Sequence, residues 1–215
     1  MLCRPDGVPI SAIIFGGRRS TTVPLVYQAR SWDHGVFIGA SMTSETTAAA
    51  AGKRGVLRND PFAMRPFCGY NMADYFAHWL TFKNRTNPKK LPHVFHVNWF
   101  RKSTGGKFLW PGFGDNIRVI DWILQRCDLP ANDTSNAQDS IIGMLPTHSA
   151  INIDGLDLAS DAIDELNRVD AREWLLDIGK NKEFLNTFGD RLPKDISNQL
   201  ELLESKLLQA DPLSK

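Results

Sequence analysis

The sequence predicts an α/β fold in which a mixed β-sheet is followed by a C-terminal helical segment. Short apolar runs at residues 10–15, 23–27 and 35–39 are bounded by glycines and polar residues, as β-strands are. Further along, apolar side chains recur at helical intervals between residues 72 and 82 and again after residue 116. With 42% hydrophobic and 23% charged residues, the chain has the composition of a protein with a packed core.

Net charge and cysteine usage argue against several classes of protein. The 25 basic and 24 acidic side chains leave a net charge of +1, so no field over the whole molecule attracts a nucleic acid or an anionic membrane. No apolar run reaches the roughly 18 residues that span a bilayer. Cys3, Cys68 and Cys127 lack the spacing of a metal site or a disulfide framework, which favours a reducing, cytoplasmic compartment.

The first predicted strand leads into a loop that carries two arginines. Gly16 and Gly17 stop the apolar run at residues 10–15, and Arg18 and Arg19 follow directly. A guanidinium at this point can bind a phosphate or a carboxylate through two parallel hydrogen bonds. The alternative is a pair of solvated surface side chains, and the sequence leaves both interpretations open.

Residues 41–55 are small and polar, with few side chains that could form a core. We expect a mobile loop with a helical turn near residues 48–51. Such a segment suits a lid over a site, because glycine hinges and few core contacts favour movement; the alternative is a plain surface loop. The nearest match to the phosphate-binding loop G-x-x-x-x-G-K-[ST], at residues 52–55, lacks the Ser or Thr that holds a metal.

A helix and a strand are expected next. Residues 72–82 predict a helix whose apolar side carries Tyr75, Phe76, Trp79 and Leu80. Residues 93–100 alternate as a largely buried strand would. His93 and His96 are three residues apart, which places them on opposite faces of a strand and argues against a metal pair.

A strongly amphipathic helix is predicted over residues 116–127, with Asp115 supplying the N-cap carboxylate. The apolar positions at helical intervals are Ile117, Ile120, Leu124 and Cys127.

The polar, turn-rich stretch 130–138 predicts a boundary near residue 130, which divides the chain into residues 1–130 and 131–215. Two helices are expected in the second part, at 162–188 and 194–209. We interpret that part as a mainly helical appendage of the same domain, used for packing or oligomer contacts.

Aromatic side chains are concentrated in a glycine-rich stretch, as Trp99, Phe100, Phe108, Trp110 and Phe113. A loop offers no packed face for each ring, whereas projected rings can stack on a flat heterocycle, for about 1–3 kcal/mol per base. The amide of Asn116 offers both a donor and an acceptor to a base edge. The sequence leaves open a purine-stacking site and a mixed core and surface hairpin, and Lys102 and Lys107 add a single-stranded nucleic-acid binder as a third reading.

Three blocks of sequence, in this order, resemble one family. They are residues 13–19 (IIFGGRR), 60–67 (DPFAMRPF) and 95–102 (FHVNWFRK), the last leading into 106–116. Together they resemble the C-terminal part of GTP-dependent phosphoenolpyruvate carboxykinase, from about residue 8 to the end and more weakly after about residue 130. The resemblance implies part of a nucleotide-binding domain. The family converts oxaloacetate and GTP to phosphoenolpyruvate, GDP and carbon dioxide, using manganese or magnesium.

The resemblance implies roles for individual residues. Phe100, Phe108 and Phe113 match the rings that stack on guanine, and Asn116 matches the amide that reads the guanine edge, with Trp99, Gly114 and Asp115 beside them. Arg19 matches the arginine that contacts the nucleotide phosphates. Residues 41–55 match the lid that excludes water during phosphoryl transfer, and its residues here include Ser41, Glu45, Thr47, Gly52 and Gly55.

The family's phosphate loop, reactive cysteine, metal ligands and most oxaloacetate contacts precede the matched region, so we expect no catalytic and no metal-binding residue here. The chain is then expected to be a fragment that is inactive alone, cytoplasmic or mitochondrial, and monomeric when complete, with no nucleic-acid or membrane partner. Thr43, Gly52 and Cys68 depart from the family pattern, which affects the closed lid. A non-catalytic guanine-nucleotide-binding module is the main alternative.

Overall fold

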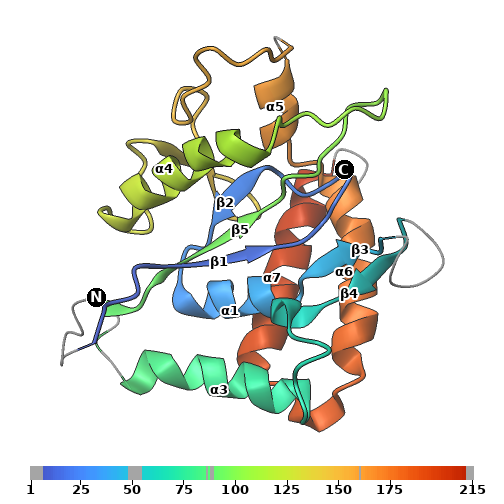
Figure 1. Cartoon of the computed structure of the whole chain (residues 1–215). Coiled ribbons are helices and arrows are strands. Elements are labelled where there is room, and N and C mark those ends of the chain that lie inside the picture. The colour runs from blue at the N-terminus through green and yellow to red at the C-terminus, as the bar shows by residue number, and fades with distance from the viewer. Residues whose placement is uncertain (1–6, 48–54, 86, 88–89, 160, 212–215) are drawn as a thin grey trace.

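The computed structural model in Figure 1 describes residues 7–47, 55–85, 87, 90–159 and 161–211. Within them, one sheet has five strands in the order β1-β5-β2-β7-β6. The strands are β1 (Ala12–Gly16), β2 (Val26–Gln28), β5 (His93–Val97), β6 (Ala137–Asp139) and β7 (Met144–Pro146). β1 and β5 are parallel and the other neighbours are antiparallel, so the sheet is mixed and the predicted α/β class is confirmed.

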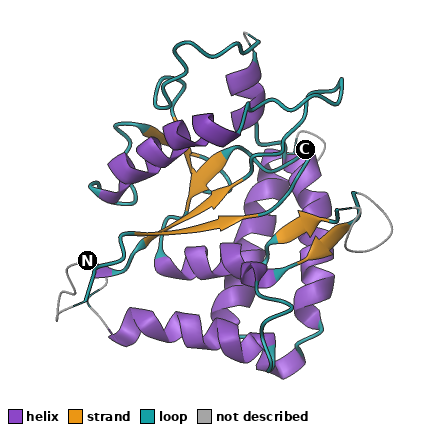
Figure 2. Cartoon of the chain, viewed as in Figure 1, coloured by secondary structure: helices purple, strands orange, loops and turns teal. Residues whose placement is uncertain are grey.

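Helices cover both faces of this sheet, as Figures 1 and 2 show. On one face lies α4 (Asn116–Cys127), over an apolar cluster that contains Phe95 and Trp122. The other face carries a second cluster, which contains Phe15 and Phe76 and is surrounded by α1 (Trp32–Ala40), α3 (Met72–Arg85), α6 (Ala171–Asn186) and α7 (Lys194–Ala210). Successive side chains of a strand point to opposite faces, which is how one short strand such as β1 serves both clusters.

α1 is a helix where the sequence predicted a strand at residues 35–39, so that prediction is wrong. Ser31 caps the helix, because its hydroxyl oxygen accepts a hydrogen bond from the backbone N–H of His34 at 3.2 Å. Residues 34–40 are all buried, so the helix has no polar face and its sequence shows no helical period. Gly35 allows close packing on β5: a Cβ there would stand 2.6 Å from the Cβ of Val94.

α3 and α4 confirm the helices predicted at residues 72–82 and 116–127, but the buried face of α4 is not the predicted one. The side chains that it buries are Val119, Trp122, Ile123 and Arg126, whereas Ile117 and Leu124 are exposed. The helix has two apolar faces, and the one that contains Trp122 packs on the sheet. The Trp122 ring meets the ring of Phe95 edge-on.

Asp115 does not cap α4. A turn of 3-10 helix (Phe113–Asp115) precedes the helix, so Asp115 already has helical backbone angles, whereas an N-cap residue is extended. Its carboxylate instead forms an ion pair with Arg118, at 3.1 Å from Nε.

The residues after 130 join the same sheet through β6 and β7 and the same core through α6 and α7. The helix predicted at 162–188 is interrupted: α5 (Ala162–Asn167) ends, and Asp170 then caps α6 by accepting from the N–H groups of Arg172 and Glu173. The division of the chain near residue 130 stays a prediction.

The segment predicted as a mobile loop has an ordered base. β3 (Thr43–Glu45) and β4 (Leu57–Asn59) form an antiparallel pair, and Met42 and Thr43 are buried. The prediction of a mobile loop over residues 41–55 is therefore wrong at this base, because backbone hydrogen bonds between the two strands hold it although its side chains are small. Residues 48–54, with the predicted helical turn and Gly52, lie outside the described residues.

Candidate functional site

The aromatic stretch folds as a hairpin whose rings differ in exposure. Lys102 and Phe108 face each other in an antiparallel bridge, and the rings of Phe100 and Phe108 meet edge to face with centroids 6.2 Å apart. Trp110 is buried, whereas Phe108 is 55% and Phe113 96% exposed. The left-handed backbone of Gly112 and Phe113, with φ of 79° and 47°, turns the chain at this point. The ring of Trp110 thus belongs to the core, whereas the rings of Phe108 and Phe113 lie at the surface.

Trp110 fixes the amide of Asn116. The indole Nε1–H donates a hydrogen bond to Oδ1 of Asn116 at 2.9 Å. An indole N–H only donates, so the amide must turn its oxygen toward Trp110 and its NH2 group away from it. The residue predicted to read a base edge is therefore held in one orientation by a core side chain.

Two cations lie against the paired rings. The guanidinium carbon of Arg18 is 3.8 Å from the centroid of Phe100, and Nζ of Lys102 is 5.1 Å from the centroid of Phe108. Both distances are within the range of cation–π attraction. The arginine pair predicted after the first strand is thus divided, because Arg18 stacks on an aromatic ring while Arg19 turns inward.

Asn98 connects the aromatic hairpin to the arginine loop. Its buried Oδ1 accepts from the backbone N–H groups of Arg19 and Phe100, at 3.2 and 3.1 Å, and its amide donates to the carbonyl of Val23. The sequence analysis assigned no role to Asn98. The available signal was an amide side chain within the buried strand predicted at residues 93–100, because a buried amide needs hydrogen-bond partners. Trp99 is half-buried beside the cluster under α4, and Gly114 is exposed.

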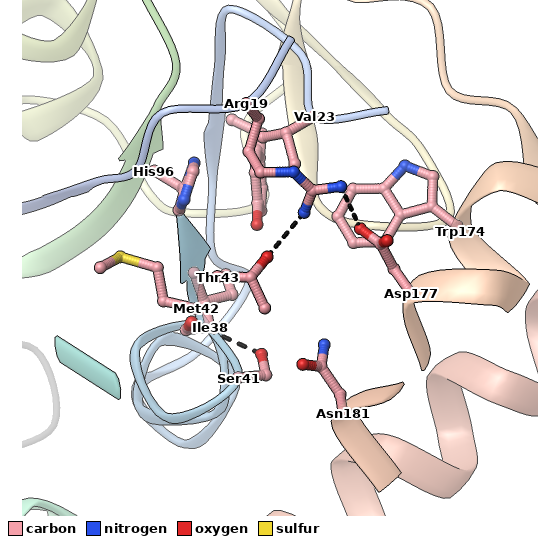
Figure 3. A pocket seen from close by; sticks show the side chains of 11 residues that line it. Arg19, Val23, Ile38, Ser41, Met42, Thr43, His96, Trp174, Asp177 and Asn181 are labelled. Carbon is pink, nitrogen blue, oxygen red and sulfur yellow. Dashed lines mark hydrogen bonds and ion pairs between the residues drawn. The ribbon is translucent and has the colours of Figure 1, made fainter. Parts of the chain in front are cut away.

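Arg19 is buried in a polar pocket rather than open to solvent (Figure 3). Its Nη1 donates to Oγ1 of Thr43 at 2.7 Å, and its Nη2 forms an ion pair with Asp177 at 2.5 Å. Thr43 and Asp177 belong to β3 and α6, so this one guanidinium joins the loop after β1 to both elements. Its contact with the nucleotide phosphates stays a prediction.

The same pocket perturbs two titratable groups. Burial, assisted by the positive charge of Arg19, lowers the pKa of His96 to about 3. The Nδ1 atom of His96 is buried and has no hydrogen-bond partner among the described residues. Burial raises the pKa of Tyr27 well above its usual 10, although Arg19 acts in the opposite direction. Both side chains are therefore neutral near pH 7.

Asp177 and Asn181 are site residues that sequence reasoning missed. Both lie on the buried face of α6 and line the pocket in Figure 3, and Oδ1 of Asn181 accepts from the amide of Asn59 in β4 at 3.1 Å. The available signal was two polar residues four apart on a face otherwise made of Trp174, Ile178 and Leu185. The partners lie too far apart in sequence for a local pattern to pair them.

The described lid residues lie around the base of the β3–β4 pair. Ser41 ends α1, with its hydroxyl donating to the carbonyl of Phe37. Glu45 accepts from the backbone N–H and the hydroxyl of Ser20, at 2.6 and 2.5 Å. Thr47 and Gly55 are exposed, and Gly55 has a left-handed φ of 76°. Their roles in a lid stay predictions.

Over the parts of the chain that the structure describes, no helix has the length and apolar character to cross a membrane. Nor do three His, Cys, Asp or Glu side chains gather there as a metal site. For the manganese or magnesium that the resemblance implies, the described residues thus offer no cluster of three such side chains.

The fold defines an α/β protein, and its aromatic hairpin is the candidate site for stacking a purine base. Residues 2–206 match the family model described as the phosphoenolpyruvate carboxykinase C-terminal P-loop domain, and the chain therefore belongs to that family.

Curated relatives have the same family name. The chain is 54% identical over 203 residues to phosphoenolpyruvate carboxykinase [GTP] of Chlamydia caviae, and 49% identical over 205 residues to that of Neocallimastix frontalis. It is 48% identical over 203 residues to the protein of the same name from an Arthrobacter species. These matches cover 94–95% of this chain and 33% of each relative. The chain thus spans about a third of the length of these relatives.

Proposed function

We propose that this chain contributes the guanine pocket of a GTP-dependent phosphoenolpyruvate carboxykinase. The observation that carries the proposal is the hydrogen bond from Trp110 to Asn116. With its oxygen committed to the indole, the amide of Asn116 is left to donate. A donor matches the O6 carbonyl of guanine and opposes the exocyclic amine of adenine. This arrangement supports a preference for guanine over adenine.

The aromatic side chains supply the stacking. Phe100 and Phe108 meet at an interplanar angle of 68°, so a base that stacks on one of them meets the edge of the other. Arg18 lies over one side of the Phe100 ring, so a base would have to stack on the opposite side. The nearly full exposure of Phe113 supports a role in which its ring is buried only when a nucleotide binds.

Arg19 is proposed to bind the nucleotide phosphates, as the resemblance implies. Its two terminal nitrogens already have partners, so a phosphate would have to share them or displace Thr43 or Asp177. Asp177 then acts as a stand-in anion that keeps the buried guanidinium paired in the absence of ligand.

The reaction of the complete enzyme is also part of the proposal. Oxaloacetate and GTP would be converted to phosphoenolpyruvate, GDP and carbon dioxide, and a divalent metal would stabilise the charge on the transferred phosphoryl group. In this arrangement the present chain binds and orients the base and excludes water. The resemblance implies that the phosphate loop and the metal ligands would lie in the other two thirds of the relatives' chain. By itself the chain is expected to bind nucleotide without turnover, in the cytoplasm, and the complete enzyme to be monomeric.

Titration of the chain with GDP, followed by tryptophan fluorescence, tests the pocket. Trp99 and Trp110 belong to the hairpin, so bound GDP should change the emission. Phe113→Ala should weaken binding roughly tenfold or more, because one stacking ring is lost. Phe67→Ala, which removes another exposed ring outside the hairpin, is the matched control and should leave the affinity unchanged. No response at millimolar GDP, or equal effects of the two variants, would contradict the proposal.

The two lysines of the hairpin support the nucleic-acid alternative. Lys102 lies over the ring of Phe108, and Lys107 is exposed, so positive charges stand beside aromatic rings as they do in single-strand binders. A single-stranded oligonucleotide would then bind with a steep salt dependence and free GDP would not. Running both ligands in the same titration decides between the two functions.

A further inference from the structure

The loop after β1 and the aromatic hairpin meet at one buried side chain, that of Asn98. This residue directly follows β5, and its side chain is fully buried. Its Oδ1 accepts hydrogen bonds from the backbone N–H groups of Arg19 and Phe100, at 3.2 and 3.1 Å. The ring of Phe100 is proposed to stack on the base, and Arg19 is proposed to bind the phosphates. One oxygen atom therefore holds the backbone at both ends of the proposed nucleotide site.

The Asn98 amide has one orientation that satisfies its partners. Its oxygen serves the two backbone N–H groups, and its NH2 group donates to the carbonyl of Val23 at 2.9 Å. The backbone N–H of Asn98 also donates, to the carbonyl of Leu25 at 2.9 Å. The residues that lead into β2 thus hold the amide from one side. A shift of Arg19 or Phe100 away from it would leave a buried N–H group without its acceptor, which is costly.

Two further contacts join the same two segments beside Asn98. The backbone N–H of Lys102 donates to the carbonyl of Ser20 at 2.9 Å. The guanidinium carbon of Arg18 lies 3.8 Å from the centroid of the Phe100 ring. The arginine loop and the start of the hairpin therefore form one connected unit. Within it, the contribution of Asn98 comes from a side chain and can be removed by substitution, whereas the bond from Lys102 to Ser20 belongs to the backbone and stays.

We propose that Asn98 couples the binding of the base to the binding of the phosphates. It is a positioning residue, because it acts through the backbone of Arg19 and Phe100 and not by contact with the nucleotide. A ligand that orders one end of this unit also orders the other, so the second group binds at a lower cost in entropy. By thermodynamic linkage the effect is equal in both directions. The inference deepens the proposed function and rests on it.

Two half-ligands test the coupling in the unaltered chain. Guanosine carries the base without phosphates, and inorganic pyrophosphate carries the phosphates without the base. In amide hydrogen exchange, guanosine should slow the exchange of the Arg19 N–H about threefold or more, and pyrophosphate should do the same for the Phe100 N–H. We call this effect cross-protection. Protection confined to the end that each half-ligand occupies would overturn the proposal.

Replacement of Asn98 gives the second readout. Asn98→Ala should abolish the cross-protection and weaken the binding of GDP at least about tenfold more than that of guanosine, because GDP alone needs both ends in register. Gln28→Ala is the matched control: its amide is equally buried, and its partners His93 and Arg126 lie outside the candidate site. The control should keep the cross-protection and the wild-type ratio of the two affinities.

The outcomes separate this proposal from the proposed function. Equal losses of GDP and guanosine affinity in Asn98→Ala, or an equal loss of cross-protection in Gln28→Ala, would overturn the coupling and leave the guanine pocket standing. If Asn98→Ala does not fold, the half-ligand measurement on the unaltered chain still decides. Absence of binding by GDP, guanosine and pyrophosphate alike would contradict the pocket itself, and the coupling with it.

Discussion

At the scale of the residue, buried polar side chains hold the irregular segments of this protein in place. Arg126 is fully buried, and its guanidinium donates to the side chain of Gln28 at 2.7 Å and to the carbonyls of Ala131 and Asp133 at 3.0 and 2.9 Å. A buried charge of this kind is tolerated only when hydrogen bonds satisfy it. The turn-rich stretch after α4 is thus fixed to the sheet by one side chain, and Asn98 and Trp110 act in the same way at the candidate site.

The Trp110–Asn116 hydrogen bond yields a prediction about specificity. Trp110→Phe removes the donor, so the Asn116 amide is free to flip and offer its oxygen to adenine. We expect the preference for GDP over ADP to fall about tenfold or more, measured by parallel titrations. Trp122→Phe is the matched control, because it shortens an equally buried indole and removes a similar hydrogen bond, to the carbonyl of Asn136. The preference of Trp122→Phe for GDP over ADP should equal that of the wild type. An unchanged preference in Trp110→Phe would refute the proposal that Trp110 orients the Asn116 amide.

Because two histidines are buried, we expect the free energy of unfolding to fall in acid. Burial lowers the pKa of His34 and of His96 to about 3, with Arg30 and Lys206 adding to the effect at His34 and Arg19 at His96. In the unfolded chain both return to about 6.5, so the unfolded state takes up more protons below that pH. The stabilisation is fully present above about pH 6.5 and is lost as pH falls toward 3.

Denaturant unfolding at pH 7 and pH 5 measures this effect. Because each histidine takes up a proton only in the unfolded state, each should lower the free energy of unfolding by about 2 kcal/mol between pH 7 and pH 5. His96→Gln should reduce the pH dependence, because it removes one of the two buried imidazoles. Equal pH dependence in wild type and His96→Gln would show that His96 is not held neutral by the fold.

At the scale of the element, sequence reasoning succeeded where one face of an element is polar. α3 and α4 follow a clear helical period and were predicted near their observed bounds. α1 was missed because it is buried all around, and β6 and β7 were missed because three residues carry no period. The aromatic hairpin could be predicted from composition, but Asp177 could not, since its partner Arg19 is 158 residues away.

The packing of α1 on β5 gives a prediction at this scale. Gly35→Ala would place a Cβ 2.6 Å from the Val94 side chain, inside a packed core, and should lower the free energy of unfolding by about 1–3 kcal/mol. Gly179→Ala on α6 is the control, because no atom of the described residues stands within 4 Å of a Cβ there; it should be neutral or stabilise by up to about 1 kcal/mol. Urea denaturation compares them, and a neutral Gly35→Ala would show that α1 does not approach β5 so closely.

At the scale of the whole molecule, the described residues form a mixed sheet with helices on both faces, and β1 and β6 are its two edge strands. The C-terminal helices are part of this core, because α7 packs on α1 and α6 supplies the buried partner of Arg19.

The most direct test of the central claim is a ¹H–¹⁵N spectrum of the chain titrated with GDP and, separately, with ADP. Tryptophan indole N–H groups give separate signals, and Trp110 donates its N–H to the amide proposed to read the base. We predict that GDP shifts the Trp110 indole signal and the backbone signals of Phe100, Phe108 and Phe113, while the indoles of Trp122 and Trp174 stay in place and ADP has little effect. Unchanged spectra at millimolar GDP, or equal shifts with GDP and ADP, would contradict the assignment of a guanine pocket to this hairpin.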